Sequence, residues 1–503
     1  MPIHKITANG KKVAVIGSGF GGLSTAIRLQ AAGFQVQIFE KRDLPGGRAY
    51  VFKEKGFTFD AGPTVITEPA CLEELFQLTG KKMDQYVKMV PVTPFYRLVF
   101  DDGYRFDYTN DDKELYRQIN EKNPEDVSGY KKFLAYSKEV YNEGYTKLAA
   151  VPFLKVWDML KVAPQLVKLS AHRSVYSVIS KFIKDEHLRQ AFSFHSLLVG
   201  GNPFSTSSIY TLIHYLERNG GVFFPMGGTS ALVNGLVRYF EDLGGKITYN
   251  SEIEKILTND QSEVSGIRTL SGNTWDCDAV VSNGDVYLTY KNLLADNSNI
   301  KMRRKWLEHS RFSMSLFLIY FGTKKKYNDI THHTVLFGPR YKELLEEIFK
   351  GGTLPDDFSL YLHAPTKTDP SLAPEGHDAF YVLAPVANLG KLKIDWEKEA
   401  PIYSEKILKH LEEKYLPNLR ENIVVKKIFT PNDFETQLNS HLGAAFSLEP
   451  VLTQSAYFRQ HNKDENIKGL YFAGAGTHPG AGVPGVVNSG KATAGLVIKD
   501  FQQ

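Results

Sequence analysis

A glycine-rich turn near the start of the chain constrains the fold more than any other feature. An apolar run at residues 13–16 predicts a β-strand, and residues 23–32 predict a helix that ends at Gly33. Residues 34–39 predict a second apolar strand, which stops at Glu40. Three glycines lie between the first strand and the helix: Gly17, Gly19 and Gly22. Strand, tight turn, helix and strand in this order predict a βαβ unit of a parallel α/β sheet.

The spacing of these glycines suits a dinucleotide. In such a turn Gly17 permits the tight bend, Gly19 lets the backbone approach a pyrophosphate, and Gly22 lets helix and strand pack closely. The helix N-terminus then presents free N–H groups to the phosphates. Glu40 lies 23 residues after Gly17, where an acid accepts hydrogen bonds from ribose hydroxyls. The first unit therefore predicts a dinucleotide site.

Two further segments distinguish between the dinucleotides. Residues 41–48 read KRDLPGGR, in which Gly46 and Gly47 allow a second close backbone approach and Arg48 adds a fixed cation. A glycine-rich run at residues 474–485 lies between a predicted strand and a predicted helix, which implies backbone pressed against a planar ligand. A simple NAD domain needs no such run, so the pattern favours FAD.

Segments that fit a dinucleotide-binding domain alternate along the chain with segments that fit a second domain. This order predicts two discontinuous domains. Predicted helices lie at residues 111–120, 126–143, 231–243, 402–414 and 486–500. Predicted strands lie at residues 247–249, 280–283, 314–321 and 470–473. We expect residues 1–75, 221–290 and 430–503 to form the FAD-binding domain. We expect residues 76–220 and 291–429 to form a substrate-binding and membrane-associating domain.

Composition narrows the class of protein. The 503 residues carry 60 basic and 56 acidic side chains, a net charge of +4 that argues against a nucleic-acid partner. Cys71 and Cys277 are outside any CxxC spacing, which argues against a disulfide framework or a zinc site and fits a reducing compartment. No window reaches the roughly 18 to 20 apolar residues of a membrane span, and the first residues contain no apolar signal segment. We therefore expect a cytoplasmic protein.

Five segments resemble a known family. They are GSGFGG at residues 17–22 with Glu40, PGGRAY at 45–50, FTFDAGPTVIT at 57–67, FSFHSLLVGGNPF at 192–204 and GAGTHPGAGVPG at 474–485. They resemble the bacterial-type phytoene desaturases, the carotenoid branch of the amine-oxidase-like flavoproteins, and the likeness runs along essentially the whole chain. The resemblance implies an α/β fold with a Rossmann-type, glutathione-reductase-like FAD-binding domain and a discontinuous α+β substrate domain. It also implies stepwise conversion of phytoene, through phytofluene, zeta-carotene and neurosporene, to all-trans lycopene.

The resemblance also implies a set of cofactor-binding residues. Ile253 is expected to contact the adenine edge through its backbone, and Ala475 stands where many relatives outside the carotenoid branch have an acid. The full set is Gly17, Ser18, Gly19, Gly22, Glu40, Lys41, Gly47, Arg48, Gly62, Pro63, Ile253, Gly474, Ala475, Val483 and Val486.

Desaturation needs few catalytic groups. It removes a hydride to flavin N5 and a proton from the neighbouring carbon, and because the developing positive charge is allylic, a weak base suffices. We expect no catalytic triad and assign no catalytic residue. Asp60 is a candidate electrostatic partner, with a helix or loop cap as its alternative role.

The histidines are expected to be structural. No sequence spacing among them indicates a metal site, and we expect no metal. We expect His195 to be a core residue with satisfied polar atoms and His478 to brace the glycine-rich run. The histidines considered are His195, His332, His333, His363, His441 and His478.

Residues 151–173 are a candidate docking segment for a lipid bilayer surface. Ten apolar residues, Trp157 among them, alternate with cations, a composition that can lie in the interface of an anionic membrane. An amphipathic helix packed on the substrate domain is the alternative, and Pro164 is expected to kink or split the segment. The cations are Lys155, Lys161, Lys168 and Arg173.

Other functions stay open. A carotene cis/trans isomerase and a desaturase of another polyene share the scaffold, and the motifs do not separate them. Proteins of the GDP-dissociation-inhibitor type resemble the fold, carry prenylated partners and bind no flavin; the glycine turn and Arg48 argue against this class. The expected partners are phytoene and later carotene intermediates, a bilayer surface, and oxygen or a quinone as electron acceptor. The sequence assigns no oligomeric state.

Overall fold

The predicted βαβ unit opens the described part of the chain, which is residues 10–502 of a computed structural model. The unit consists of β1 (Lys12–Ile16), α1 (Phe20–Ala31) and β2 (Gln35–Phe39). α1 begins three residues before its predicted start because Gly21 and Gly22 are already helical. The expected lack of a signal segment concerns residues 1–9, which lie outside the described residues.

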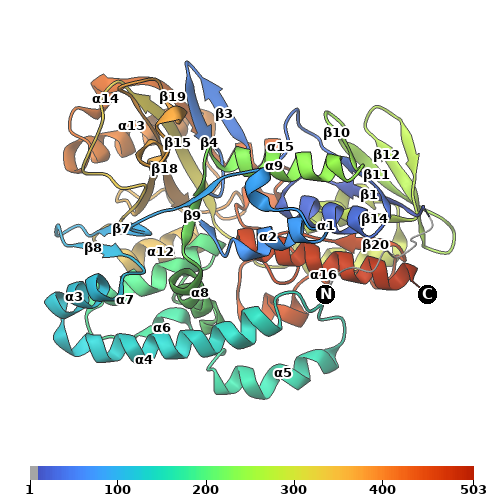
Figure 1. Ribbon diagram of the computed structural model, residues 1–503, viewed down its shortest axis with the longest axis horizontal. Helices are drawn as coiled ribbons and strands as arrows, with labels where there is room; N and C mark the ends of the chain where they lie inside the picture. The colour runs from blue at the N-terminus through green and yellow to red at the C-terminus, as the bar shows by residue number, and fades with distance from the viewer. Residues whose placement is uncertain (1–9, 503) are drawn as a thin grey trace.

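A parallel five-stranded sheet forms one lobe of the molecule. Its strand order is β10, β2, β1, β14, β20, and every neighbouring pair is parallel. The other three strands are β10 (Lys246–Thr248), β14 (Ala279–Ser282) and β20 (Leu470–Phe472). Segments from the start, middle and end of the chain therefore meet in one sheet, as the colours of β1, β14 and β20 show in Figure 1. We call this sheet and the elements packed on it the parallel-sheet lobe.

Alternate side chains of β1 pack on opposite faces of this sheet. Val13 and Val15 contact a layer of helices, and Ala14 faces a layer that contains a three-stranded sheet. Burial on both faces explains why β1 reads as one continuous apolar run. The helices include α1, α2 (Ala70–Gln77), α9 (Thr229–Asp242) and α16 (Val483–Phe501). The strands of the other layer are β11 (Ile253–Thr258), β12 (Val264–Thr269) and β13 (Thr274–Asp276).

The last helix packs closely on the first. A Cβ added to Gly490 of α16 would lie 2.7 Å from Ser24 Cβ of α1, so only glycine allows this approach. Ser24 Oγ donates a hydrogen bond of 2.8 Å to the carbonyl oxygen of Val487. α16 begins three residues before its predicted start because Pro484 fits the first turn of a helix, where an N–H is not needed.

A seven-stranded sheet forms the second lobe. Its strand order is β19, β15, β18, β17, β16, β7, β8, with mixed pairing directions. All nine residues of β15 are buried, and the strand confirms the prediction at residues 314–321. The strands are β7 (Tyr96–Val99), β8 (Arg105–Tyr108), β15 (Ser315–Thr323), β16 (His333–Leu336), β17 (Leu360–His363), β18 (Asp378–Val386) and β19 (Ile423–Phe429). We call this sheet and the helices packed on it the mixed-sheet lobe.

Helices cover both faces of the mixed sheet. α13 (Trp396–Lys414) covers one face and starts six residues before its predicted start. The prediction missed these first turns, which include Pro401 and which burial of Trp396 and Ala400 holds in place. Helices on the other face include α3 (Asp112–Lys122), α4 (Pro124–Tyr141), α6 (Val175–Ile179), α7 (Glu186–Ser193) and α12 (Tyr341–Lys350).

Two small sheets carry the chain between the lobes. One is the hairpin of β3 and β4, and the other has the order β5, β9, β6. Their bounds are β3 (Val51–Glu54), β4 (Phe57–Asp60), β5 (Ile66–Thr67), β6 (Met89–Pro91) and β9 (Val222–Pro225).

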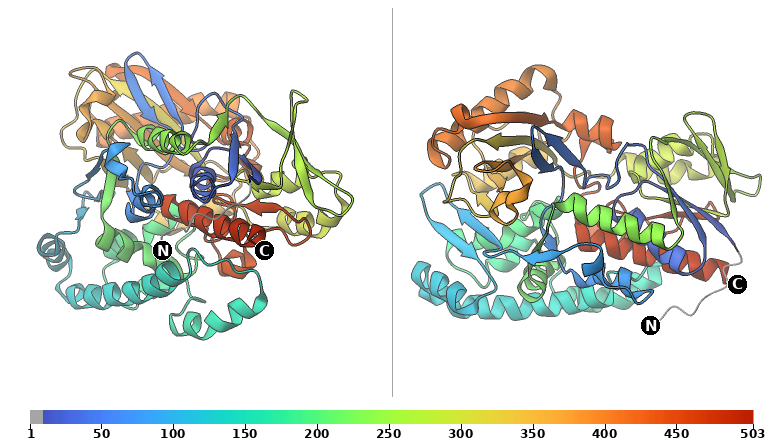
Figure 2. Two further views of the ribbon diagram at one scale, coloured as in Figure 1. Left: turned by 45° about the vertical axis from the view of Figure 1, so that its right-hand side comes forward. Right: turned by 45° about the horizontal axis from the view of Figure 1, so that its top comes forward.

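α5 (Val156–Lys168) lies at the lower edge of the molecule, below α4 in Figure 1 and apart from the main body in the left view of Figure 2. None of its residues is buried. Pro164 was expected to kink or split the segment, and the split does not occur, because the helix continues through this proline. An exposed helix tolerates the lost hydrogen bond because water can satisfy the freed carbonyl. Within residues 10–502, no helix is both long and apolar enough to cross a membrane.

Candidate functional site

One cavity of about 850 Å³ is lined by residues of both lobes. Every predicted cofactor-binding residue lines it except Gly22, which packs behind the wall. Residues from the beginning, middle and end of the chain therefore share one site, as the resemblance implied.

The glycine turn after β1 leaves no room for side chains. Gly17 has φ +92°, and its N–H donates a hydrogen bond of 2.8 Å to the Phe39 carbonyl oxygen. A Cβ on Gly22 would overlap the carbonyl oxygen of Gly17, and a Cβ on Gly19 would lie 2.8 Å from Asn283 Oδ1. Asn283 follows β14 and also lines the cavity. Sequence reasoning missed it, although a polar residue directly after a buried strand of such a sheet is a usable signal.

Glu40 is held by the glycine turn. Its Oε2 accepts hydrogen bonds from the N–H of Ser18 at 2.9 Å and from Ser18 Oγ at 2.6 Å. Its Oε1 accepts the N–H of Arg42 at 2.9 Å. Three donors orient a carboxylate that is only 5% exposed and lines the cavity.

Lys41 and Ile253 line the cavity beyond Glu40. Lys41 Nζ donates hydrogen bonds to Asn439 Oδ1 at 2.7 Å and to the Thr436 carbonyl oxygen at 3.0 Å. Ile253 is the first residue of β11 and is 6% exposed. This end of the cavity combines a fixed cation with the apolar side chain of Ile253, which suits the adenosine end of a dinucleotide.

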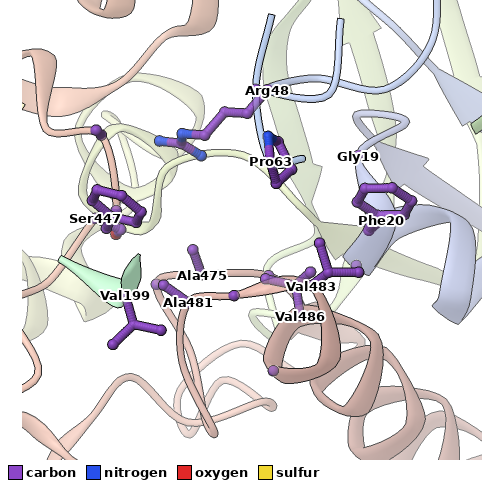
Figure 3. A pocket seen from close by; sticks show the side chains of 18 of the residues that line it. Gly19, Phe20, Arg48, Pro63, Val199, Ser447, Ala475, Ala481, Val483 and Val486 are labelled. Atoms are coloured by element: carbon purple, nitrogen blue, oxygen red, sulfur yellow. The ribbon is translucent and has the colours of Figure 1, made fainter. Parts of the chain in front are cut away.

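Arg48 is a buried cation on the cavity wall. Its Nη2 donates a hydrogen bond of 2.8 Å to Ser440 Oγ, and its Nε has no hydrogen-bond partner within residues 10–502. Burial lowers the pKa of Arg48, and the nearby Asp285 carboxylate opposes that shift. Figure 3 shows the side chain reaching across the cavity, on the opposite side from Ala475 and Val486. A buried guanidinium with an unpartnered N–H fits an anionic or carbonyl-bearing ligand.

Gly62 and Pro63 follow β4 and continue this wall. A Cβ on Gly62 would overlap the carbonyl oxygen of Arg48, so the two backbone segments touch. Gly47 lies against the first turn, since a Cβ there would be 3.5 Å from the Cα of Gly19. The segments at residues 41–48 and 57–67 thus pack directly beside the glycine turn.

The C-terminal glycine-rich run forms the opposite wall. Gly474 has φ +114°, and its N–H donates a hydrogen bond of 2.9 Å to Ser489 Oγ. The carbonyl oxygen of Ala475 accepts a hydrogen bond of 2.6 Å from Arg459 Nη2. Val483 and Val486 lie in the first turn of α16, whose N-terminus has no side-chain cap and faces the cavity (Figure 3). Free N–H groups at a helix start stabilise negative charge on a bound group.

The remaining cavity wall is mostly apolar and comes mainly from the mixed-sheet lobe and from α8 (Leu212–Gly220). A dinucleotide would not fill this apolar part of the cavity, and its lining suits a hydrocarbon. Its apolar residues include Leu197, Leu198, Val199, Ile213, Leu216, Met314, Leu316, Leu318, Val335, Phe337, Leu345, Leu360 and Leu383.

Asp60 does not line the cavity. Its Oδ1 accepts the N–H of Thr229 at 2.8 Å at the start of α9, so it serves as the helix cap that was its alternative role. Burial raises the pKa of Asp60 to about 7, although backbone N–H groups of Thr229 and Ser230 oppose the shift. The candidate electrostatic role at the substrate is not supported by this position.

Three histidines form a buried cluster that sequence spacing did not indicate. One ring nitrogen from each of His332, His333 and His363 lies within 4.8 Å of the other two. His333 Nδ1 is 2.6 Å from Tyr361 Oη, and His332 Nε2 is 3.1 Å from His363 Nε2. Burial lowers the pKa of all three, and the cluster contains no carboxylate. The rings therefore form a neutral support behind Tyr361, which lines the cavity.

His478 and His195 differ in their contacts. His478 Nε2 is 2.9 Å from the Leu148 carbonyl oxygen, and burial lowers its pKa to about 4, in agreement with a neutral, bracing residue. His195 is buried, but neither ring nitrogen makes a well-aligned hydrogen bond within the described chain, so the expectation of satisfied polar atoms is wrong. Its Nε2 lies 3.0 Å from Glu217 Oε2.

Comparison with known proteins identifies a matching family and similar sequences. The family model described as "Flavin containing amine oxidoreductase" matches residues 20–498. A lycopene-forming phytoene desaturase of Pseudescherichia vulneris is 58% identical over 98% of this chain and 100% of its own length. A lycopene-forming phytoene desaturase of Pantoea ananas is 56% identical over the same shares.

Solved structures share the fold. An oxidoreductase from Methanosarcina mazei has a TM-score of 0.64 at 20% identity, covering 97% of this chain and 100% of that one. Wild-type putrescine oxidase bound to putrescine has a TM-score of 0.64 at 14% identity, covering 97% and 99%. The α/β fold with one cavity between two lobes, the glycine turn and the full-length matches agree: the chain belongs to the flavin containing amine oxidoreductase family and, within it, to the phytoene desaturases.

Proposed function

We propose that this chain is an FAD-dependent desaturase that converts phytoene, through phytofluene, zeta-carotene and neurosporene, to all-trans lycopene. The observation that carries the proposal is the continuity of one cavity, in which a dinucleotide-binding wall runs into an apolar wall. Relatives named as lycopene-forming phytoene desaturases, at 55–58% identity, support the same substrate and product.

The residues present fit FAD. Ser18, Glu40 and the glycine turn would hold the adenosine half and the pyrophosphate, while Arg48 and the start of α16 would stabilise negative charge at the flavin end. The unpartnered Nε of Arg48 supports a polar ligand there. When bound, the flavin would take a hydride equivalent from the substrate.

The apolar wall would bind and orient the carotene. A hydrocarbon has no ionisable group, so affinity must come from burial, at roughly 0.8 kcal/mol per methylene. The wall also excludes water from the reacting carbons, which protects a developing allylic cation. The proposed FAD-binding domain of residues 1–75, 221–290 and 430–503 includes all strands of the parallel sheet, and the substrate domain of residues 76–220 and 291–429 includes all strands of the mixed sheet.

The proposed source of the substrate is a bilayer surface, and the proposed location is cytoplasmic with peripheral membrane association. On α5, Trp157 is 66% exposed and Val167 is 67% exposed, whereas Val162 and Leu166 line the cavity. One helix thus joins an exposed apolar surface to the cavity wall. Phe153, just before this helix, is buried, so part of the segment also has the packing role that was the alternative.

Incubation with phytoene tests the function. Protein saturated with FAD is added to liposomes that contain phytoene, with oxygen or a quinone present, and the product spectrum is read. All-trans lycopene is the expected product. Isomerised substrate without oxidation would indicate the isomerase, and conversion only of another polyene would indicate a different substrate. Protein that stays colourless after FAD saturation would indicate a carrier of the GDP-dissociation-inhibitor type.

A further inference from the structure

Glu217 is an acidic residue in the apolar part of the cavity wall. It lies on α8, whose neighbouring residues Ile213 and Leu216 also line the cavity. Its exposed fraction is 0%. Burial of a carboxylate is costly unless partners compensate it, so such a group in the wall of a hydrocarbon site indicates a function.

One oxygen of this carboxylate is held, and the other is not. Tyr96 Oη donates a hydrogen bond of 2.6 Å to Oε1 of Glu217. Oε2 is buried and makes no hydrogen bond with any residue from 10 to 502. His195 Nε2 lies 3.0 Å from Oε2 but outside hydrogen-bond geometry. Oε2 is therefore a buried acceptor with a second basic group beside it.

The other carboxylates on the cavity wall lie elsewhere. Glu40 binds the glycine turn, and Asp285 accepts backbone N–H groups at the start of α10 (Val286–Leu288). Glu252 and Glu254 flank the start of β11, at the adenosine end. Among the described residues, Glu217 is thus the one carboxylate in the apolar part of the wall.

A chain of contacts connects Glu217 to the segment expected at the flavin. Thr64, which follows Pro63, has its Oγ1 3.0 Å from Tyr361 Oη, and that hydroxyl is 2.6 Å from His333 Nδ1. The His333 ring centroid is 5.8 Å from that of Tyr96, the partner of Glu217. Three side chains therefore separate Glu217 from Thr64.

We propose that Glu217 accepts the proton lost in each desaturation, an inference that rests on the desaturase function proposed above. One C–H bond breaks as a hydride, which reduces the flavin by two electrons. The C–H bond on the neighbouring carbon breaks as a proton that Oε2 takes, and its electron pair forms the C=C bond. The proton then passes through His195 to water, and oxygen or a quinone reoxidises the flavin. Tyr96, which donates to Oε1, is a positioning residue for the carboxylate.

Glu217→Gln tests the proposal in protein loaded with FAD. Loss of a general base should lower phytoene conversion by about 10²- to 10⁴-fold. FAD content after gel filtration and Tm should match wild type, because glutamine keeps the shape and can still accept from Tyr96. The rate of flavin reduction is then measured without oxygen, by the loss of flavin absorbance, with phytoene deuterated at the proton-losing carbon. The isotope effect on this rate should be larger in Glu217→Gln than in wild type. Deuterium at the hydride-losing carbon should not raise its isotope effect.

Glu449→Gln is the matched control. It removes another fully buried carboxylate, one that pairs with Arg311 at 2.8 Å and does not line the cavity. This variant should keep conversion within about threefold of wild type. Conversion by Glu217→Gln at that same level, or a large loss with unchanged isotope effects, overturns the proposal.

Two further outcomes distinguish failure of the role of Glu217 from failure of the proposed desaturase function. Where Glu217→Gln fails to retain FAD, Glu217→Asp decides: a raised isotope effect at the proton-losing carbon supports the role, and a wild-type value overturns it. Absence of conversion by the wild-type protein rejects the desaturase function itself, and this inference with it.

Discussion

Ser18 binds Glu40 twice: its hydroxyl donates a hydrogen bond of 2.6 Å to Glu40 Oε2, and its backbone N–H donates one of 2.9 Å to the same oxygen. These bonds join the glycine turn to the end of β2, so the acid that would bind the ribose also orders the turn that would bind the pyrophosphate. Glu40→Arg should therefore abolish FAD retention, because it removes the acceptor and buries a cation. Flavin absorbance after gel filtration measures this.

Ser18→Ala is the milder companion of that variant. It removes the hydroxyl but keeps the backbone N–H, so FAD should bind about ten- to a hundredfold more weakly, the effect of one hydrogen bond to a charged group. Wild-type flavin content in Glu40→Arg would contradict the assigned adenosine site.

The variant Asp60→Asn should distinguish a role of Asp60 as helix cap from a role in catalysis. Burial raises the pKa of Asp60 to about 7, above its unfolded value of about 4, so the folded state favours the protonated form. The contribution of Asp60 to the free energy of unfolding is therefore greatest below about pH 4, and it is lost as the pH rises through about 7. The free energy of unfolding of Asp60→Asn, measured with urea, should therefore rise by about 2–3 kcal/mol relative to that of wild type as the pH increases from 5 to 8.

The same variant should keep phytoene conversion near the wild-type rate, because Asp60 lies outside the cavity wall. Asp60→Ala, which also loses the bond to Thr229, should be destabilised at low pH by roughly 1 kcal/mol. A large loss of turnover in Asp60→Asn with FAD still bound would restore the electrostatic role.

Replacement of the exposed face of α5 should uncouple the protein from membranes. Trp157→Ser combined with glutamate at Lys155, Lys161 and Lys168 should lower binding to anionic liposomes by about a hundredfold or more, since each cation contributes about 1 kcal/mol near such a surface. Flotation measures the binding. FAD should stay bound, because no residue of α5 is buried.

Charge reversal on other helices controls for net charge. Glutamate at Lys350, Lys398 and Lys409, whose side chains are 62–81% exposed, should leave flotation nearly unchanged. If the α5 variant floats like wild type, this helix is not the docking surface.

Turnover should depend on an oxidant other than a nicotinamide. The glycine turn between β1 and α1 lines the cavity, and the proposed FAD fills this dinucleotide site. Without oxygen, conversion should stop after about one two-electron step per flavin, and added oxygen or quinone should restore it. Consumption of NAD in step with product would require a different hydride acceptor.

Local sequence was sufficient to predict the residues that line the proposed cofactor side of the cavity. The tight turn, the close approach and the ribose acid each depend on residue types within a short segment, so Gly17, Gly19 and Glu40 could be read directly. Strand and helix periodicity likewise predicted β1, α1, β15 and α16. The effects of prolines were less predictable: the segment expected to kink or split at Pro164 is one continuous helix, and α13 begins before its predicted start and runs through Pro401.

Tertiary structure alone decided the substrate side. Glu217, Tyr96 and His195 lie on three elements with no common motif, and only the packing of α8 on the mixed-sheet lobe brings them together. His333 meets His363 because β16 and β17 pair in that register, and a shift of one residue would turn one ring to the other face. Contacts between distant segments depend on register and packing across the whole chain, which local sequence patterns do not reveal.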